Sequence, residues 1–89
     1  MVVSKEMLIV NRLGLHARAA AQLVKLANSF TSEITIERED EQVNAKSIMG
    51  ILMLAAACGS RIQVTVDGED AEAAIMAIEE LVNDGFGEG

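Results

Sequence analysis

The single histidine of this chain lies in the segment Gly14-Leu15-His16-Ala17-Arg18, between a β-branched apolar run and a strongly helix-forming one. This position predicts that His16 stands at or beside the start of a helix. The first turn of a helix has unpaired N–H groups and the positive end of the helix dipole, so it binds anions, phosphate above all. Arg18 adds a cation whose forked donors suit phosphate oxygens. Together these residues predict a neutral, nucleophilic imidazole beside an anion site, whereas an isolated histidine would more simply be a cap or surface residue.

A second group of residues joins a hydroxyl to an uncharged apolar run. The run from Ile48 to Cys58 is predicted to be a helix, with Ser47 as its N-cap and Gly59 as its C-terminal cap. A small domain cannot bury every side of such a helix, so we expect an exposed docking patch of Ile48, Met49, Leu52 and Met53. The alternatives are a buried central helix or one hidden by dimerisation. Ser47 likewise either only caps the helix or is also phosphorylated beside this patch.

The elements that must position these residues alternate between strand and helix patterns. Strands are expected over residues 2–10, 32–37, 42–44 and 61–66, and helices over residues 17–29, 48–58 and 71–82. The fold class is therefore α+β: a two-layer, open-faced sandwich in the order β-α-β-β-α-β-α, with three helices on one face of a four-stranded antiparallel sheet. The other sheet face should be wetter. Residues 85–89 are expected to fray, with Phe86 as the residue that could pack.

Particular side chains are assigned to the faces of these elements. Ile62, Val64 and Val66 are expected to point inward from the last strand. The apolar stripe of the first helix is predicted to contain Ala17, Ala20, Leu23, Val24, Leu26 and Ala27. The first turn of the last helix is expected to hold Glu69, Asp70 and Glu72.

Composition narrows the classes of function. The 89 residues suffice for one domain, spanning residues 1–89, and the net charge of −7 disfavours nucleic acid and anionic membranes as partners. Residues 1–7 do not have the pattern of a secretory signal, and the most apolar run would span only about 16 Å as a helix, so we expect a cytoplasmic protein without membrane insertion. Cys58 and His16 are each the only residue of their type, so we expect no disulfide, no metal and no cofactor, with Cys58 as a packing residue.

Two motifs, Gly14-Leu15-His16-Ala17-Arg18 and Lys46-Ser47-Ile48-Met49-Gly50, resemble those of the histidine-containing phosphocarrier protein (HPr) family of the bacterial phosphoenolpyruvate-dependent phosphotransferase system. The resemblance covers essentially the whole chain. It implies that His16 accepts a phosphoryl group on Nδ1 from phosphorylated enzyme I and passes it to enzyme IIA, for sugar uptake or a nitrogen-linked branch. The protein would then be a monomeric carrier rather than a stand-alone enzyme.

The resemblance also implies roles for other residues. Arg18 would support the phosphate, and Ser47 would correspond to the site that an HPr kinase/phosphorylase modifies. Docking would use Leu15, Ala17, Ile48, Met49, Leu52 and Met53. One departure is Ala19, where most relatives have a proline, and this change weakens pre-organisation of the helix start rather than the chemistry.

Two other functions remain open at this point. One is a regulatory module, controlled by phosphorylation of Ser47, that binds a transcriptional regulator or metabolic enzyme. The other is a small-ligand sensor on a generic α+β sandwich. Retention of both His16 and Arg18 argues against regulation as the only role.

Overall fold

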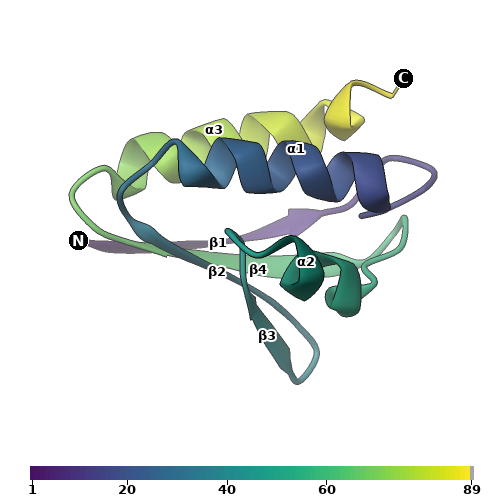
Figure 1. Ribbon diagram of the computed structural model, residues 1–89, viewed down its shortest axis with the longest axis horizontal. Helices are drawn as coiled ribbons and strands as arrows, with labels where there is room; N and C mark the ends of the chain where they lie inside the picture. Colours follow the sequence, from purple (N-terminus) through teal and green to yellow (C-terminus); the bar gives the residue numbers. More distant parts are fainter. Residues whose placement is uncertain (89) are drawn as a thin grey trace.

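The computed structural model describes residues 1–88, in which helices cover one face of an antiparallel sheet (Figure 1). The elements in chain order are β1 (Val2–Leu8), α1 (Ala17–Asn28), β2 (Glu33–Arg38), β3 (Glu41–Asn44), α2 (Ile48–Leu54), β4 (Arg61–Asp67), α3 (Ala71–Asn83) and the short 3₁₀ helix η1 (Gly85–Gly87). The predicted order β-α-β-β-α-β-α and the two-layer sandwich are confirmed, and η1 is an addition at the C-terminal end.

Strand β4 lies inside the sheet, whose order is β1-β4-β2-β3, and it pairs antiparallel with both β1 and β2. Its register places Val64 opposite Lys5 of β1 and opposite Ile36 of β2. Because side chains alternate along a strand, Ile62, Val64 and Val66 all point toward the helices and are buried. The inward pattern predicted for this strand is confirmed.

The outer face of the sheet carries polar side chains that bond to one another. The hydroxyl oxygens of Ser4 on β1 and Thr65 on β4 are 3.0 Å apart, and the Gln63 amide donates to Ser4 Oγ at 2.6 Å. All three side chains lie on the face away from α1 and α3. The expectation of a wetter outer face is therefore confirmed.

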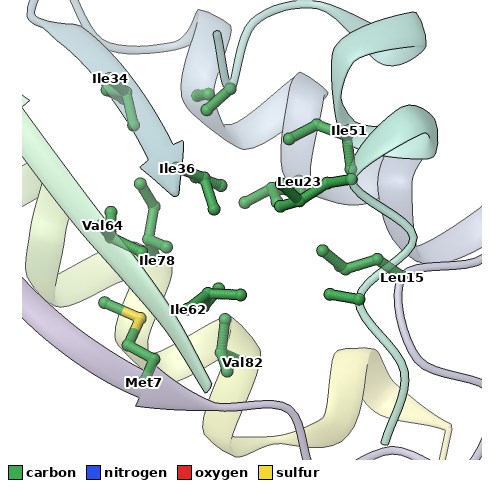
Figure 2. Packing of buried hydrophobic residues seen from close by; sticks show 14 of the residues in the cluster. Met7, Leu15, Leu23, Ile34, Ile36, Ile51, Ile62, Val64, Ile78 and Val82 are labelled. Carbon is green, nitrogen blue, oxygen red and sulfur yellow. The ribbon is translucent and has the colours of Figure 1, made fainter. Parts of the chain in front are cut away.

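The core fills the space between the sheet and the helices. Figure 2 shows side chains of all layers meeting there, among them Met7, Ile36, Ile62, Leu23, Ile78 and Val82. Leu15 and Ile51 extend this core toward α2. Burying a Leu or Ile side chain contributes about 1.5–3 kcal/mol, so this packing fixes the starts of α1 and α2 relative to the C-terminal segment. Figure 1 shows the start of α1 and the C-terminal segment at the same end of the molecule, on the right, with α2 below that half of α1.

Helix α2 is shorter than predicted. It ends at Leu54, and Ala55 adopts a left-handed conformation (φ 51°), so the predicted helix to Cys58 and the cap at Gly59 were wrong. The chain leaves the helix early because Ala56 is buried and its carbonyl accepts the N–H of Leu15 at 2.9 Å. Within α2, Gly50 packs closely against β3, since a Cβ there would lie 3.2 Å from Val43 Cβ.

Two further expectations need correction. In α1, Ala17 is exposed and Ala19 lies on the buried stripe instead. Ala19 shares that face with Ala20, Leu23 and Ala27, which follow it at helical spacing. The expected fraying is wrong for residues 85–88, because Gly85–Gly87 form η1 and the N–H of Glu88 bonds to the carbonyl of Gly85. The packing expected for Phe86 is confirmed, since its side chain is buried. The expected fraying of Gly89 lies outside the described residues.

The first turn of α3 also differs from expectation. Glu72 lies in that turn as predicted, but Asp70 is the N-cap residue and its side chain does not cap the helix. Its carboxylate instead accepts the backbone N–H groups of Thr31 at 2.8 Å and Ser32 at 3.0 Å, in the loop after α1. Asp70 thereby connects the end of α1 to the start of α3. Within residues 1–88, no helix is long and apolar enough to cross a membrane.

Candidate functional site

His16 is the N-cap residue of α1, in an extended backbone conformation (φ −74°, ψ 179°). The first intrahelical bond runs from the N–H of Ala20 to the carbonyl of His16 at 2.8 Å, so the N–H groups of residues 17–19 precede the helical ladder. The side chain of His16 makes no capping hydrogen bond, and the first turn of the helix holds no acidic residue. The predicted position of His16 is confirmed, and the open end of α1 can receive an anion.

The loop before His16 is held in a single conformation by glycine and by three hydrogen bonds. Gly14 has φ +65°, and a Cβ on it would lie 2.5 Å from the carbonyl oxygen of Ala56. The side chain of Asn11 donates to the Gly14 carbonyl at 2.8 Å, the Gly14 N–H donates to the Asn11 carbonyl at 3.1 Å, and the N–H of Leu15 donates to Ala56. Any side chain at Gly14 would push this loop away and move His16.

The carboxylate of Glu88 is the closest charged group to the imidazole. Its Oε2 contacts His16 Nε2, and its Oε1 accepts a hydrogen bond from the Asn11 side-chain amide at 3.0 Å. The Asn11 amide, then the His16 imidazole and, less strongly, the charge of Arg18 hold the pKa of Glu88 below its ordinary value, against partial burial that raises it. Glu88 is therefore ionised at neutral pH.

An open hollow surrounds these groups. It is lined by His16, Arg12, Arg18 and Cys58 and by the C-terminal segment around Glu88. The His16 side chain is 27% exposed, which leaves it reachable from solvent. Cys58 is exposed, so its predicted packing role was wrong; it lies beyond the true end of α2, in the turn before β4. Among residues 1–88, no three His, Cys, Asp or Glu side chains are grouped so as to hold a metal ion.

Comparison with known proteins identifies the family. Residues 3–84 match the family model described as "PTS HPr component phosphorylation site". The chain belongs to the HPr family. It is 46% identical to the phosphocarrier protein HPr of Cupriavidus necator over 88 residues, which cover 99% of each chain. It is 48% identical to that of Neisseria meningitidis serogroup B over 81 residues, or 91% of each chain. The crystal structure of HPr-C-His from Thermoanaerobacter tengcongensis superposes with a TM-score of 0.95 at 41% identity, covering 98% of each chain.

In this HPr family member, the apolar side chains predicted to be exposed on α2 are exposed. Met49 and Met53 are 64% and 67% exposed, and Ile48 and Leu52 are also exposed. Ile51 and Leu54 face the core, so the same short helix presents one buried and one open side. Ala17, on the first turn of α1, is exposed as well. We call Ala17, Ile48, Met49, Leu52 and Met53 the docking patch.

Leu15 corrects the predicted docking set. Its side chain is only 4% exposed and lies in the core (Figure 2), so it is not available to a partner. Leu15 entered that set through the resemblance to the HPr family. The left-handed Gly14 and the bond from the Leu15 N–H to Ala56 turn its side chain inward instead.

Ser47 and Ala19 complete the set of residues selected from the sequence. The hydroxyl of Ser47 accepts the N–H of Gly50 at 3.1 Å, so the predicted N-cap of α2 is confirmed. Ala19 is fully buried as the third residue of α1, and the helix forms there without a proline.

Two residues of the site were not selected from the sequence, namely Asn11 and Glu88. Glu88 is 72 positions from His16, in a glycine-rich segment without periodicity. Asn11 carried one signal that could have found it, since an asparagine three residues before a glycine is typical of a side chain that bonds to a turn.

Proposed function

We propose that this protein is a phosphocarrier of the phosphoenolpyruvate-dependent phosphotransferase system, in which His16 accepts a phosphoryl group from phosphorylated enzyme I and passes it to enzyme IIA. The observation that carries the proposal is the imidazole at the uncapped N-terminus of α1, in a chain of the HPr family. The relatives named phosphocarrier protein HPr match it over nearly its whole length, and they support the same role here.

The local chemistry favours a group that carries negative charge on His16. A usual N-cap residue supplies a side-chain oxygen that accepts the N–H of the second or third helical residue. His16 has no such oxygen, and its ring makes no capping hydrogen bond. A phosphoryl group on the ring would bring three acceptor oxygens to this position, where the N–H groups of residues 17–19 and the helix dipole favour them. The exposed Arg18 would add a mobile positive charge at the rim.

The docking patch supports the part of the proposal that concerns partners. Its exposed methionines adapt to differently shaped surfaces, which suits a carrier that must meet a donor and an acceptor in turn. Helix α2, which carries four of the five patch residues, packs against α1 and lies below the half of α1 that begins after His16 (Figure 1). A partner that covers the patch would therefore bring its own reacting group close to the imidazole. Enzyme I and enzyme IIA are the partners that we propose for this surface. The monomeric state and the cytoplasmic location remain predictions.

The test is transfer of label from phosphoenolpyruvate. In the presence of enzyme I, the wild type should acquire acid-labile phosphate that then passes to an enzyme IIA domain, whereas His16→Ala should acquire none. Equal labelling of the two proteins would contradict the proposal. Labelling a panel of enzyme IIA domains from the phosphorylated carrier would then distinguish sugar uptake from a nitrogen-linked branch.

Arg18 has a narrower role in the same proposal. Because its side chain is exposed, Arg18→Ala should leave thermal stability within about 0.5 kcal/mol of the wild type but slow phosphoryl transfer about tenfold or more. Arg12→Ala, at another point of the same hollow, is the matched control and should transfer faster than Arg18→Ala. Wild-type rates in Arg18→Ala would remove this residue from the mechanism.

Ser47 remains a predicted modification site. Its capping bond to Gly50 is a sufficient reason for a serine at this position, and the observations favour the carrier role over a purely regulatory one. Incubation with ATP and an HPr kinase should give acid-stable phosphate on the wild type and none on Ser47→Ala. Failure of an active kinase to label the protein would contradict the prediction.

A further inference from the structure

The C-terminal segment places the Glu88 carboxylate against Nε2 of His16, whereas the phosphoryl group is expected on Nδ1. Phe86 is buried and anchors this segment, and the N–H of Glu88 donates to the carbonyl of Gly85 at 3.1 Å. Oε2 of Glu88 contacts Nε2 of the imidazole. The Glu88 side chain is only 17% exposed, so its carboxylate has little freedom to move away.

Asn11 is arranged to hold this carboxylate. Its amide nitrogen donates to the Gly14 carbonyl at 2.8 Å and to Glu88 Oε1 at 3.0 Å, and both of these partners are acceptors only. The amide oxygen of Asn11 is buried with no hydrogen-bond partner in the described part of the chain. A flipped amide would place that oxygen against two other oxygens, so the orientation is fixed by its surroundings. Asn11 thus keeps one acceptor unsatisfied while both of its N–H groups bind the loop and Glu88.

The contact between Glu88 and His16 selects one form of the neutral ring. An ionised carboxylate can only accept a hydrogen bond, so the imidazole nitrogen that faces it must carry the proton. In a neutral imidazole with Nε2–H, the lone pair is on Nδ1. We propose that Glu88, held by Asn11, is a positioning residue that fixes the Nε2–H tautomer and the ring orientation, so that Nδ1 is presented as the nucleophile. This inference rests on the proposed function of His16.

The transfer step balances without moving a proton. The lone pair of Nδ1 forms the new N–P bond, and the bond between phosphorus and the donor's leaving atom breaks with its electron pair remaining on the donor. The proton on Nε2 stays in place, so the ring becomes positively charged and faces the Glu88 carboxylate. When the phosphoryl group passes to the acceptor, the N–P electron pair returns to Nδ1 and the neutral tautomer is restored.

The experiment compares Glu88→Gln with the wild type in the full chain. Nitrogen-15 NMR of the histidine ring at alkaline pH should show a protonated Nε2 and an unprotonated Nδ1 in the wild type. Glu88→Gln should shift the ring toward Nδ1–H and slow phosphorylation by phosphoenolpyruvate and enzyme I about tenfold, as is common when a partner that orients a histidine is lost. Glu88→Asp keeps a carboxylate on a shorter side chain and should fall between the two. Glu37→Gln, an exposed acid on the sheet, should match the wild type.

The outcomes separate this inference from the proposed function. A Glu88→Gln protein with the wild-type tautomer would overturn the positioning role, and so would one with an altered tautomer and a wild-type rate. In both cases His16-dependent labelling of the wild type would still stand. If the wild type accepts no label, or if His16→Ala accepts it equally, the proposed function itself fails.

Discussion

Two carboxylates at opposite ends of the fold are held by hydrogen bonds, but their donors differ in kind. Asp70 accepts from the backbone and hydroxyl groups of Thr31 and Ser32, which lie outside the hollow around His16. Glu88 accepts from Asn11 and contacts His16, the residue proposed to react. A hydrogen-bonded carboxylate therefore joins two helices at one end of the molecule and orders an imidazole at the other. Substitutions around Asp70 should lower the stability of the fold, and substitutions around Glu88 should slow phosphoryl transfer.

The largest loss of stability is expected for a substitution of Gly68, close to Asp70. A Cβ there would lie 2.2 Å from Ser32 Oγ and 2.7 Å from Ser32 Cα, and the backbone conformation (φ +159°) is unfavourable for other residues. Gly68→Ala should therefore lower the free energy of unfolding by about 2 kcal/mol or more, and Tm by about 8 °C or more. Denaturant titration and a thermal scan measure this.

Gly59→Ala is the matched control, because Gly59 also has positive φ (+91°) but no atom of residues 1–88 lies within 4 Å of its added Cβ. It should be the milder change, since it carries the backbone strain without the collision. Equal losses in the two variants would show that the contact with Ser32 is unimportant.

The second prediction concerns how the contributions of Asp70 and Glu88 to thermal stability depend on pH. The Ser32 hydroxyl, the Thr31 N–H and the other donors lower the pKa of Asp70 from 3.8 to about 2. A carboxyl with a lowered folded pKa stabilises the protein above its unfolded value and loses that contribution as the pH falls toward the folded one. Asp70→Asn should be less stable than the wild type at pH 6, and the difference in Tm should disappear between about pH 4 and pH 2.

Glu88→Gln is the comparison for this measurement. Its Tm at pH 6 should stay closer to that of the wild type than the Tm of Asp70→Asn does, because Glu88 joins a terminal segment that Phe86 already anchors. A larger loss of Tm in Glu88→Gln than in Asp70→Asn would reverse the division between a structural and a chemical carboxylate. A constant gap between the wild type and Asp70→Asn across this pH range would contradict the role of Asp70.

The two ends also differ in how far the sequence could predict them. The position of His16 was predictable because the glycine, the histidine and the helix start are neighbours in the chain, and local rules govern them. The strand and helix order followed in the same way from the periodicity of apolar residues. The hydrogen bond between Ser32 and Asp70 joins residues 38 positions apart, and the contact between His16 and Glu88 joins residues 72 positions apart. No local sequence pattern encodes such pairs.

The errors have a common physical origin in tertiary contacts. Helix α2 was extended to Cys58 on propensity, but burial of Ala56 and its bond to Leu15 stop it at Leu54. Leu15 was assigned to docking through the resemblance to the HPr family, but its side chain is buried in the core. In both cases a contact with a distant element decides the outcome, and in α2 it outweighs a helix preference of a few tenths of a kcal/mol per residue.

The smallest effect on stability is expected for substitutions in the docking patch, which should change partner binding and leave the free energy of unfolding nearly unchanged. Met49 and Met53 are largely exposed and glutamine is a good helix former, so Met49→Gln and Met53→Gln together should change the free energy of unfolding by about 0.5 kcal/mol at most. If enzyme I covers this patch, the KM for the carrier should nevertheless rise about tenfold, because the partner would lose apolar contacts at the centre of the interface. Met76→Gln on α3 is the matched control, since Met76 is as exposed as Met53 but lies outside the patch, and it should leave both quantities unchanged. A double variant with wild-type KM toward both enzyme I and enzyme IIA would place docking elsewhere on the protein.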